Sequence, residues 1–129
     1  MIGKILIVDS KERNRELISQ CLEKVSYLRV FSTHRGDTAA FLGKILLPDV
    51  IITDLYLKGL GGLEWCRRLR KSEQFEDALV IGIPEIFDTS EHSHALEAGF
   101  DLVLAKKDWG HLIPKIVKDF MLRKTINQS

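Results

Sequence analysis

The feature that most constrains the fold is a regular alternation between short apolar runs and longer amphipathic stretches. The apolar runs are rich in Ile, Leu and Val, which is typical of strands covered on both faces of a sheet. The run at 28–31 includes Arg29 and is more mixed, which favours an outer strand. The pattern predicts five strands, at Lys4–Val8, Leu28–Phe31, Val50–Thr53, Leu79–Ile83 and Leu102–Ala105.

Between and after these runs, apolar residues recur at the spacing of one helix face. The second helical stretch contains Gly43, which costs about 1 kcal/mol relative to Ala, and Leu47-Pro48 ends that stretch. Gly99 follows the fourth, where helices favour a left-handed residue. Short connections between the elements predict an α/β fold with three layers, in which an open parallel sheet has helices on both faces. The helical stretches are Leu17–Val25, Ala39–Leu46, Leu63–Leu69, Ser90–Ala98 and Leu112–Phe120.

Charge and cysteine content narrow the class of protein. Lys and Arg number 19 against 18 Asp and Glu, a net charge of +1 that is too small for a nucleic-acid-binding or membrane-surface domain. The apolar runs are too short for a membrane span or a signal peptide. Cys21 and Cys66 occupy helical apolar positions without metal or redox spacing. We therefore expect a cytoplasmic protein with one domain over residues 1–124 and a short polar tail at 125–129.

Charged residues follow three of the predicted strands. Asp9 and Asp54 come directly after the first and third strands, and Lys106 follows the fifth. Because the carboxyl ends of parallel strands meet at one edge of a sheet, these side chains should converge on one cleft. Two carboxylates and an ammonium suit a phosphate or metal–phosphoryl site. The structural alternatives are that Asp54 caps a loop and that Asp9 caps the helix beginning near Lys11.

In this order and spacing, the strand ends and helix starts resemble the receiver domain of two-component response regulators. The resemblance covers almost the whole chain. It implies a doubly wound, flavodoxin-like and CheY-like fold whose five-stranded sheet has the order 2-1-3-4-5. The segments that carry it are Lys4-Ile5-Leu6-Ile7-Val8-Asp9, Pro48-Asp49-Val50-Ile51-Ile52-Thr53-Asp54, Gly62-Leu63-Glu64, Ala95-Leu96-Glu97-Ala98-Gly99 and Lys106.

The resemblance also implies a role for each residue of the cleft. Asp54 would accept a phosphoryl group from a histidine kinase or a phosphotransfer protein of a phosphorelay. Asp9, Asp54 and the backbone carbonyl of Tyr56 would hold Mg²⁺, and Lys106 would pair with the phosphoryl oxygens. A cation and a lysine reduce the repulsion between an attacking carboxylate and a phosphate, so the chemistry agrees with these roles.

Four positions depart from the family pattern. Ser10 replaces a second acidic residue, so magnesium should bind weakly unless Glu12 folds back to replace that ligand. Pro84 stands where a hydroxyl residue ends the fourth strand, and it has neither hydroxyl nor backbone N–H. Val103 replaces the aromatic residue of the fifth strand. Lys107 replaces a proline that follows the lysine in a cis peptide, so the loop after Lys106 could be rebuilt as trans.

These observations leave two functional hypotheses. The first is an atypical receiver with phosphoacceptor Asp54, and the alternative is a phosphorylation-independent pseudo-receiver that acts as a protein–protein interaction module. In both, an output protein would dock on the face formed by the fourth helix, fifth strand and last helix, and a homodimer remains open. We expect no enzyme, because a phosphatase of this architecture needs an Asp where Tyr56 stands, and the chain has no Gly-rich nucleotide-binding turn.

Other charged and aromatic residues are interpreted as structural. His92 and His94 face different directions on a helix and should be solvated. The basic run 67–71 is followed at once by acidic residues, which indicates a solvated helix face. Trp109 begins the last helix and could lie on a partner surface.

Overall fold

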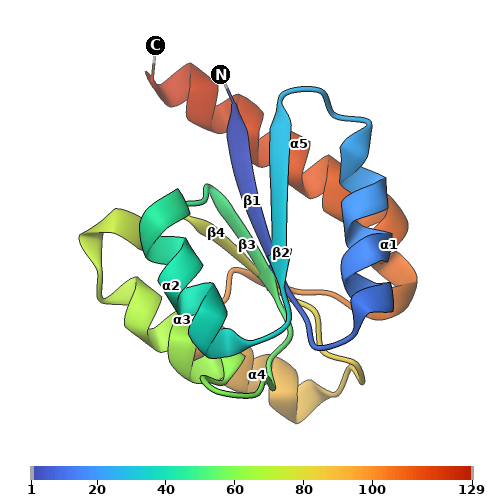
Figure 1. Ribbon diagram of the computed structural model, residues 1–129, viewed down its shortest axis with the longest axis vertical. Helices are drawn as coiled ribbons and strands as arrows, with labels where there is room; N and C mark the ends of the chain where they lie inside the picture. The colour runs from blue at the N-terminus through green and yellow to red at the C-terminus, as the bar shows by residue number, and fades with distance from the viewer. Residues whose placement is uncertain (1, 129) are drawn as a thin grey trace.

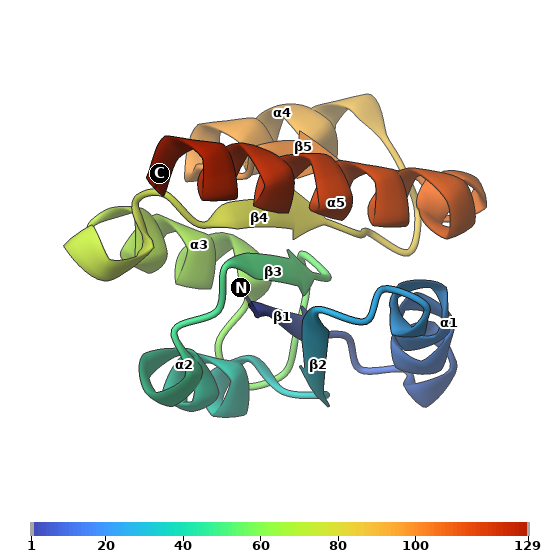
Figure 2. The same ribbon diagram turned by 90° about the horizontal axis from the view of Figure 1, so that it is seen from above.

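The computed structural model describes residues 2–128, which form a parallel sheet between two layers of helices (Figures 1 and 2). Its strand order is β2-β1-β3-β4-β5, as the resemblance implies. The strands are β1 Gly3–Val8, β2 Leu28–Thr33, β3 Val50–Thr53, β4 Leu79–Gly82 and β5 Leu102–Val103. The helices are α1 Glu12–Glu23, α2 Gly36–Leu46, α3 Gly62–Arg70, α4 Thr89–Ala98 and α5 Trp109–Gln128. Two short 3₁₀ turns, η1 Glu73–Phe75 and η2 Lys106–Asp108, complete the chain order.

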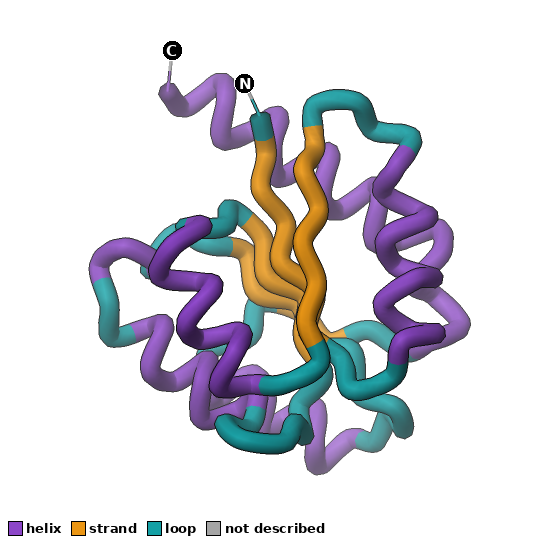
Figure 3. The backbone as a smooth tube through the Cα atoms, viewed as in Figure 1, coloured by secondary structure: helices purple, strands orange, loops and turns teal. Residues whose placement is uncertain are grey.

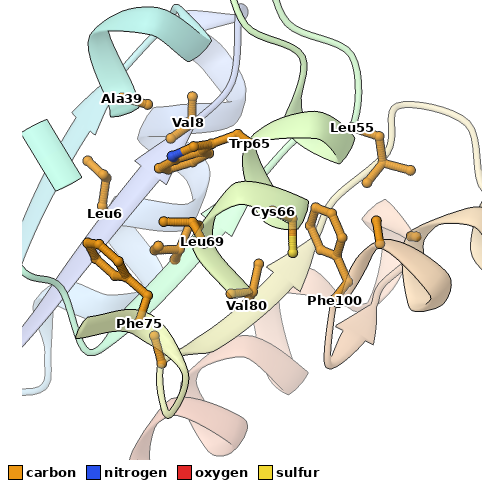
Figure 4. Packing of buried hydrophobic residues seen from close by; sticks show 14 of the residues in the cluster. Leu6, Val8, Ala39, Leu55, Trp65, Cys66, Leu69, Phe75, Val80 and Phe100 are labelled. Carbon is orange, nitrogen blue, oxygen red and sulfur yellow. The ribbon is translucent and has the colours of Figure 1, made fainter. Parts of the chain in front are cut away.

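Alternate residues of the central strands point to opposite helical layers. Ile5 and Ile7 of β1 pack toward α1 and α5, whereas Leu6 and Val8 pack toward α2, α3 and α4. The second of these cores includes Trp65, Cys66 and Leu69 of α3 (Figure 4). Because both faces are buried, the inner strands β1, β3 and β4 had to be nearly continuous apolar runs.

The two edge strands differ most from their predicted lengths. β2 continues to Thr33 and has mixed burial, which confirms an outer strand. β5 ends at Val103 rather than at Ala105, since its partner β4 ends at Gly82 and only Leu102 and Val103 pair with it.

Helix ends largely follow the sequence signals. Leu47 adopts a left-handed conformation that ends α2 before Pro48, and Gly99 does the same for α4 with φ +110°. The expected polar tail differs, because α5 continues to Gln128 and residues 125–128 are helical. Residue 129 of that tail lies outside the described residues. Within residues 2–128, no helix has the length and apolar character needed to cross a membrane.

Two expectations about charged and aromatic residues were wrong. Arg70 does not lie on a solvated face, because its guanidinium bonds to Gly99 O at 2.8 Å, Ala78 O at 2.8 Å and Asp101 at 2.7 Å. Trp109, the first residue of α5, is only 3% exposed and packs in the core, so it is not a surface residue.

Gly43 offers a test of packing in the α2 layer. A Cβ at this position would lie 3.7 Å from the Trp65 ring and 3.9 Å from the Phe75 ring, which are ordinary contacts. Gly43→Ala should therefore raise the free energy of unfolding by about 0.5–1 kcal/mol, as an Ala loses less conformational entropy in a helix. Urea unfolding measures this change. Gly62→Ala is the matched contrast and should destabilise, since its Cβ would lie 2.1 Å from Asp54 O. A destabilised Gly43→Ala variant would contradict this account of the packing.

Candidate functional site

The candidate site lies where the parallel strands end and their following loops gather (Figure 3). Val8 and Thr53 are register partners on β1 and β3, so the next residues, Asp9 and Asp54, stand side by side at the edge of the sheet. The loop after β4 adds Glu85, and the turn after β5 adds Lys106. The convergence of Asp9, Asp54 and the β5 end that the strand pattern predicts is therefore present.

Asp9 is almost completely buried, at 1% exposure, and its carboxylate is held by neighbouring donors. Oδ1 accepts the Lys11 backbone N–H at 2.9 Å, and Asn14 Nδ2 lies 3.2 Å from both carboxylate oxygens. Arg15 donates to the Asp9 backbone carbonyl at 2.8 Å. Asp9 thus holds the turn that precedes α1, while its carboxylate still borders Asp54. It is not the helix cap that the alternative predicted, because the N-cap residue is Lys11 and α1 has no side-chain cap.

Asp54 is half-buried, and its Oδ1 accepts the Leu55 backbone N–H at 2.7 Å. Burial, followed by the negative charge of Asp9, raises the pKa of Asp54 from 3.8 to about 6. Burial also raises the pKa of Asp9, against the hydrogen bonds from Lys11 and Asn14. Both carboxyls are therefore destabilised in their ionised forms, which is a property of acidic pairs at functional sites.

Glu85 is a site residue that the sequence did not predict. It lies on the solvent-exposed side of the site, here called its mouth, and contacts three polar side chains there. Its carboxylate is 2.9 Å from Lys11 Nζ, 3.2 Å from Asn14 Nδ2 and 3.8 Å from Lys106 Nζ. Lys11, Asn14 and Lys106 together lower the pKa of Glu85, with Lys11 contributing most. Its place after the fourth strand was evident from the sequence, but its partners depend on loop geometry.

Asn14 was also missed, although the sequence carried a signal for it. It lies four residues before Ile18 and eight before Leu22, on the buried face of α1. A polar side chain on an apolar stripe needs partners, because burying an unpaired amide is costly. The amide nitrogen of Asn14 finds them in Asp9 and Glu85, so it connects the buried carboxylate to the site's mouth. The amide oxygen Oδ1 is buried without a hydrogen-bond partner.

Lys106 is placed beside Glu85 rather than on Asp54. Its ammonium lies 3.8 Å from Glu85 Oε1 and 5.7 Å from the centre of the Trp109 ring. In the described residues, the one ion pair that Lys106 forms is with Glu85. Lys106 therefore sits at the site's mouth with an ammonium that is already partnered.

The residues that differ from the family pattern occupy positions that suit their side chains. Pro84 is buried two residues after the end of β4, and Val103 packs into the core at 8% exposure. Every peptide bond in residues 2–128 is trans, including the one before Lys107. Neither a hydroxyl at the end of β4 nor an aromatic ring on β5 is present to move in response to the site.

The magnesium ligands expected from the sequence give an incomplete set. Within residues 2–128, no three His, Cys, Asp or Glu side chains lie close enough to enclose a metal ion. Glu12 is exposed and lines a surface hollow with Glu16 and Glu23, so it does not replace the acidic ligand missing at Ser10. Tyr56 is 57% exposed. The ligand expected from this residue is its backbone carbonyl and not its side chain. Two carboxylates and a carbonyl remain, all of them hard oxygen donors of the type Mg²⁺ prefers.

Comparison with known proteins identifies the family. The response regulator receiver domain family matches residues 5–117, nearly the whole chain. The chain belongs to this family. Its relatives include the phosphate regulon transcriptional regulatory protein PhoB of Rhizobium meliloti, 33% identical over 106 residues. That match covers 82% of this chain and 46% of PhoB, so the chain spans about half the length of this relative.

Solved structures show the same receiver fold. The N-terminal domain of an uncharacterized protein from Wolinella succinogenes is 30% identical, with a TM-score of 0.82 covering 97% of this chain and 98% of that one. The signal receiver domain of a DNA-binding response regulator from Colwellia psychrerythraea 34H shares the fold at 22% identity, with a TM-score of 0.85 covering 92% of this chain and 98% of that one.

The family sets the general function of this receiver domain. Receiver domains belong to two-component systems, in which response regulators interact with histidine kinases and output domains, and they generally bind Mg²⁺ at the phosphorylation site. They are generally signalling modules rather than enzymes. Some relatives are larger proteins with enzyme names, such as a protein-glutamate methylesterase/protein-glutamine glutaminase of Koribacter versatilis, 31% identical over 94% of this chain and 34% of its own length.

Proposed function

We propose that this receiver domain accepts a phosphoryl group on Asp54. The observation that carries the proposal is the state of this carboxyl: it is half-buried beside Asp9, and its pKa is raised to about 6. A carboxylate with that pKa is ionised at neutral pH yet more basic than an ordinary Asp. It is therefore a better nucleophile, and one of its oxygens is fixed by the Leu55 N–H.

The chemical step is a transfer to a carboxylate oxygen. An Asp54 oxygen forms a bond to phosphorus, and the bond from phosphorus to the donor's histidine nitrogen, or to the acetate oxygen of acetyl phosphate, breaks. The leaving group keeps that electron pair, and an acyl phosphate remains on Asp54. Lys106 would bind the transferred phosphoryl oxygens, for which it must leave Glu85.

Asp9, Asp54 and the Tyr56 carbonyl would hold Mg²⁺. Two adjacent carboxylates with raised pKa values fit this role, because a divalent cation relieves both burial and mutual repulsion. When bound, the ion supplies positive charge to the phosphoryl oxygens. Since Ser10 offers no carboxylate and Glu12 is turned away, we expect this binding to be weak.

The partners follow from the same chemistry. A histidine kinase or a phosphotransfer protein would donate the phosphoryl group in the cytoplasm, and an output protein would dock on the face of α4, β5 and α5. That face could also form a homodimer. We expect no nucleic-acid binding by this domain, because its net charge is only +1.

The second candidate is a pseudo-receiver that binds its partner without phosphorylation. One observation favours it: Pro84 provides neither the hydroxyl nor the N–H through which the end of β4 could report on a phosphoryl group. This candidate predicts that Asp54→Ala leaves partner binding unchanged.

The test is intact mass spectrometry after incubation with acetyl phosphate and Mg²⁺. We expect one phosphoryl adduct, released by hydroxylamine as an acyl phosphate should be, and no adduct on Asp54→Asn. Asp77→Asn, an exposed residue away from the site, is the matched control and should be labelled like the parent. An unlabelled parent would overturn the phosphoacceptor proposal and favour the pseudo-receiver.

A further inference from the structure

Two lysines from different loops meet at the mouth of the site. Lys11 precedes α1 and Lys106 follows β5, yet both ammonium groups face the same oxygen of Glu85, at 2.9 Å and 3.8 Å. Glu85 thus holds two positive charges next to each other, beside the carboxylates of Asp9 and Asp54.

The carboxylates of the site attract the ammonium group of Lys11. The pKa of Lys11 is raised by its hydrogen bond to Glu85, then by the negative charges of Glu85, Asp9 and Asp54. The geometry places Lys11 in the same group of charges as the phosphoacceptor, because its backbone N–H is bonded to the Asp9 carboxylate and its ammonium is bonded to Glu85. The sequence pattern alone indicates no more for Lys11 than a place near the start of a helix.

The contact between Lys11 and Glu85 is easily exchanged. Their side chains are 56% and 42% exposed, and exposed ion pairs contribute little to stability because water screens them. A phosphoryl group on Asp54 would present a denser negative charge and three acceptor oxygens. It can therefore compete with Glu85 for both ammonium groups.

We propose that Lys11 is a second phosphoryl-binding residue of this domain, which joins Lys106 on the phosphoryl oxygens while Glu85 is their counterion in the unmodified protein. The proposal rests on Asp54 as phosphoacceptor. It also accounts for Ser10: where the site has one acidic metal ligand fewer, the chain itself adds a positive charge. Lys11 would thus take over part of the charge neutralisation that a strongly bound cation provides elsewhere.

Lys11→Met tests this role without disturbing the core, because Lys11 is exposed. We expect the second-order rate constant for labelling by acetyl phosphate to fall about tenfold, the effect of one lost ammonium–oxyanion contact near a protein surface. Lys11→Arg should restore most of the rate, since it keeps the charge. Glu85→Gln should raise the rate, because it frees both ammonium groups. Lys107→Met, an exposed lysine next to Lys106, is the matched control and should label like the parent.

A binding measurement separates Lys11 from any effect on turnover. Beryllofluoride with Mg²⁺ mimics a phosphoryl group on a carboxylate, and ¹⁹F NMR reports its bound fraction. Its affinity should also fall about tenfold in Lys11→Met and recover in Lys11→Arg.

The outcomes distinguish this proposal from the one on which it rests. If the parent is labelled and binds beryllofluoride but Lys11→Met matches it in both measurements, Lys11 has no phosphoryl-binding role while Asp54 keeps its own. If neither labelling nor beryllofluoride binding occurs in the parent, both proposals fail together.

Discussion

Replacing Arg70 with alanine is expected to lower the free energy of unfolding by about 2–4 kcal/mol, since hydrogen bonds to a charged group each contribute about 1.5–3 kcal/mol and water compensates part of the loss. The Arg70 guanidinium joins the end of α3 to the segment before β4 and to the connection between α4 and β5. It donates to the carbonyls of Phe75 and Ala78 before β4, to Gly99 O at the end of α4, and to the Asp101 carboxylate before β5. Removing it takes this donor from the three carbonyls, whereas the Asp101 carboxylate keeps the Val80 N–H.

Arg68→Ala is the matched control on the same helix. Arg68 is 66% exposed and has one ion pair, with Glu64 at 3.6 Å, so its loss should change stability by less than about 0.5 kcal/mol. Arg70→Lys keeps the charge but loses the planar fork of donors and should recover only part of the stability. The measurement is urea unfolding, with the midpoint compared at an unchanged slope. Equal midpoints for Arg68→Ala and Arg70→Ala would show that the Arg70 network does not hold α3, α4 and β4 together.

The error about Arg70 shows what a sequence pattern leaves out. Basic residues followed by acidic ones predict a solvated helix face, and this holds for Arg67 and Arg68, which pair with Glu64 in water. Arg70 differs because the carbonyls it binds come from η1 and the end of α4. No local pattern in the sequence describes where those carbonyls point.

The fold itself was predictable because burial on both faces leaves a direct mark on strand composition. β3 is found at the predicted residues Val50–Thr53, since every position is buried and the first three are apolar. β5 was too long in the prediction because Leu104 and Ala105 are apolar, while pairing depends on where its neighbour β4 ends. Periodicity therefore locates a strand, but its partner decides its length.

The site was predictable to the extent that parallel strands bring their ends together. Asp9 and Asp54 follow register partners, so their proximity follows from topology alone. Glu85 could be placed at the same edge but not paired, because its contacts with Lys11 and Lys106 arise from two unrelated loops. Asn14 was the avoidable omission, as its position on the buried stripe of α1 was evident.

Replacing Asp54 with asparagine is expected to stabilise the domain by about 1–2 kcal/mol at pH 7.5. Folding raises the pKa of Asp54 from 3.8 to about 6, so its ionised form opposes folding. At about 1.4 kcal/mol per pKa unit the full effect would be near 3 kcal/mol, which we reduce because water reaches this half-buried carboxylate. Asparagine removes the charge and keeps an oxygen for the Leu55 N–H.

The sign of the pH dependence distinguishes this cause from better packing. A carboxyl with a raised folded-state pKa takes up a proton on folding between pH 3.8 and about 6. Its destabilising effect is complete above pH 6 and absent below pH 3.8, so the advantage of Asp54→Asn over the parent should shrink across this range. Urea midpoints at several pH values measure the difference, with Asp77→Asn as an exposed control. A constant advantage from pH 7.5 to pH 4 would contradict the electrostatic cause.

The same pKa governs the chemistry proposed for Asp54, because only the ionised carboxylate can attack phosphorus. A pKa of about 6 applies to Asp54 without a bound cation, so labelling is compared at Mg²⁺ concentrations far below saturation. Lowering the pH from 7 to 5 then crosses this pKa and should slow labelling by acetyl phosphate about tenfold. The stabilising effect of Asp54→Asn should begin to decline in the same region, just below pH 6. If labelling stays constant while the stability difference falls, ionisation of Asp54 does not limit the reaction. If both decline together, one carboxyl links the cost in stability to the reactivity of the site.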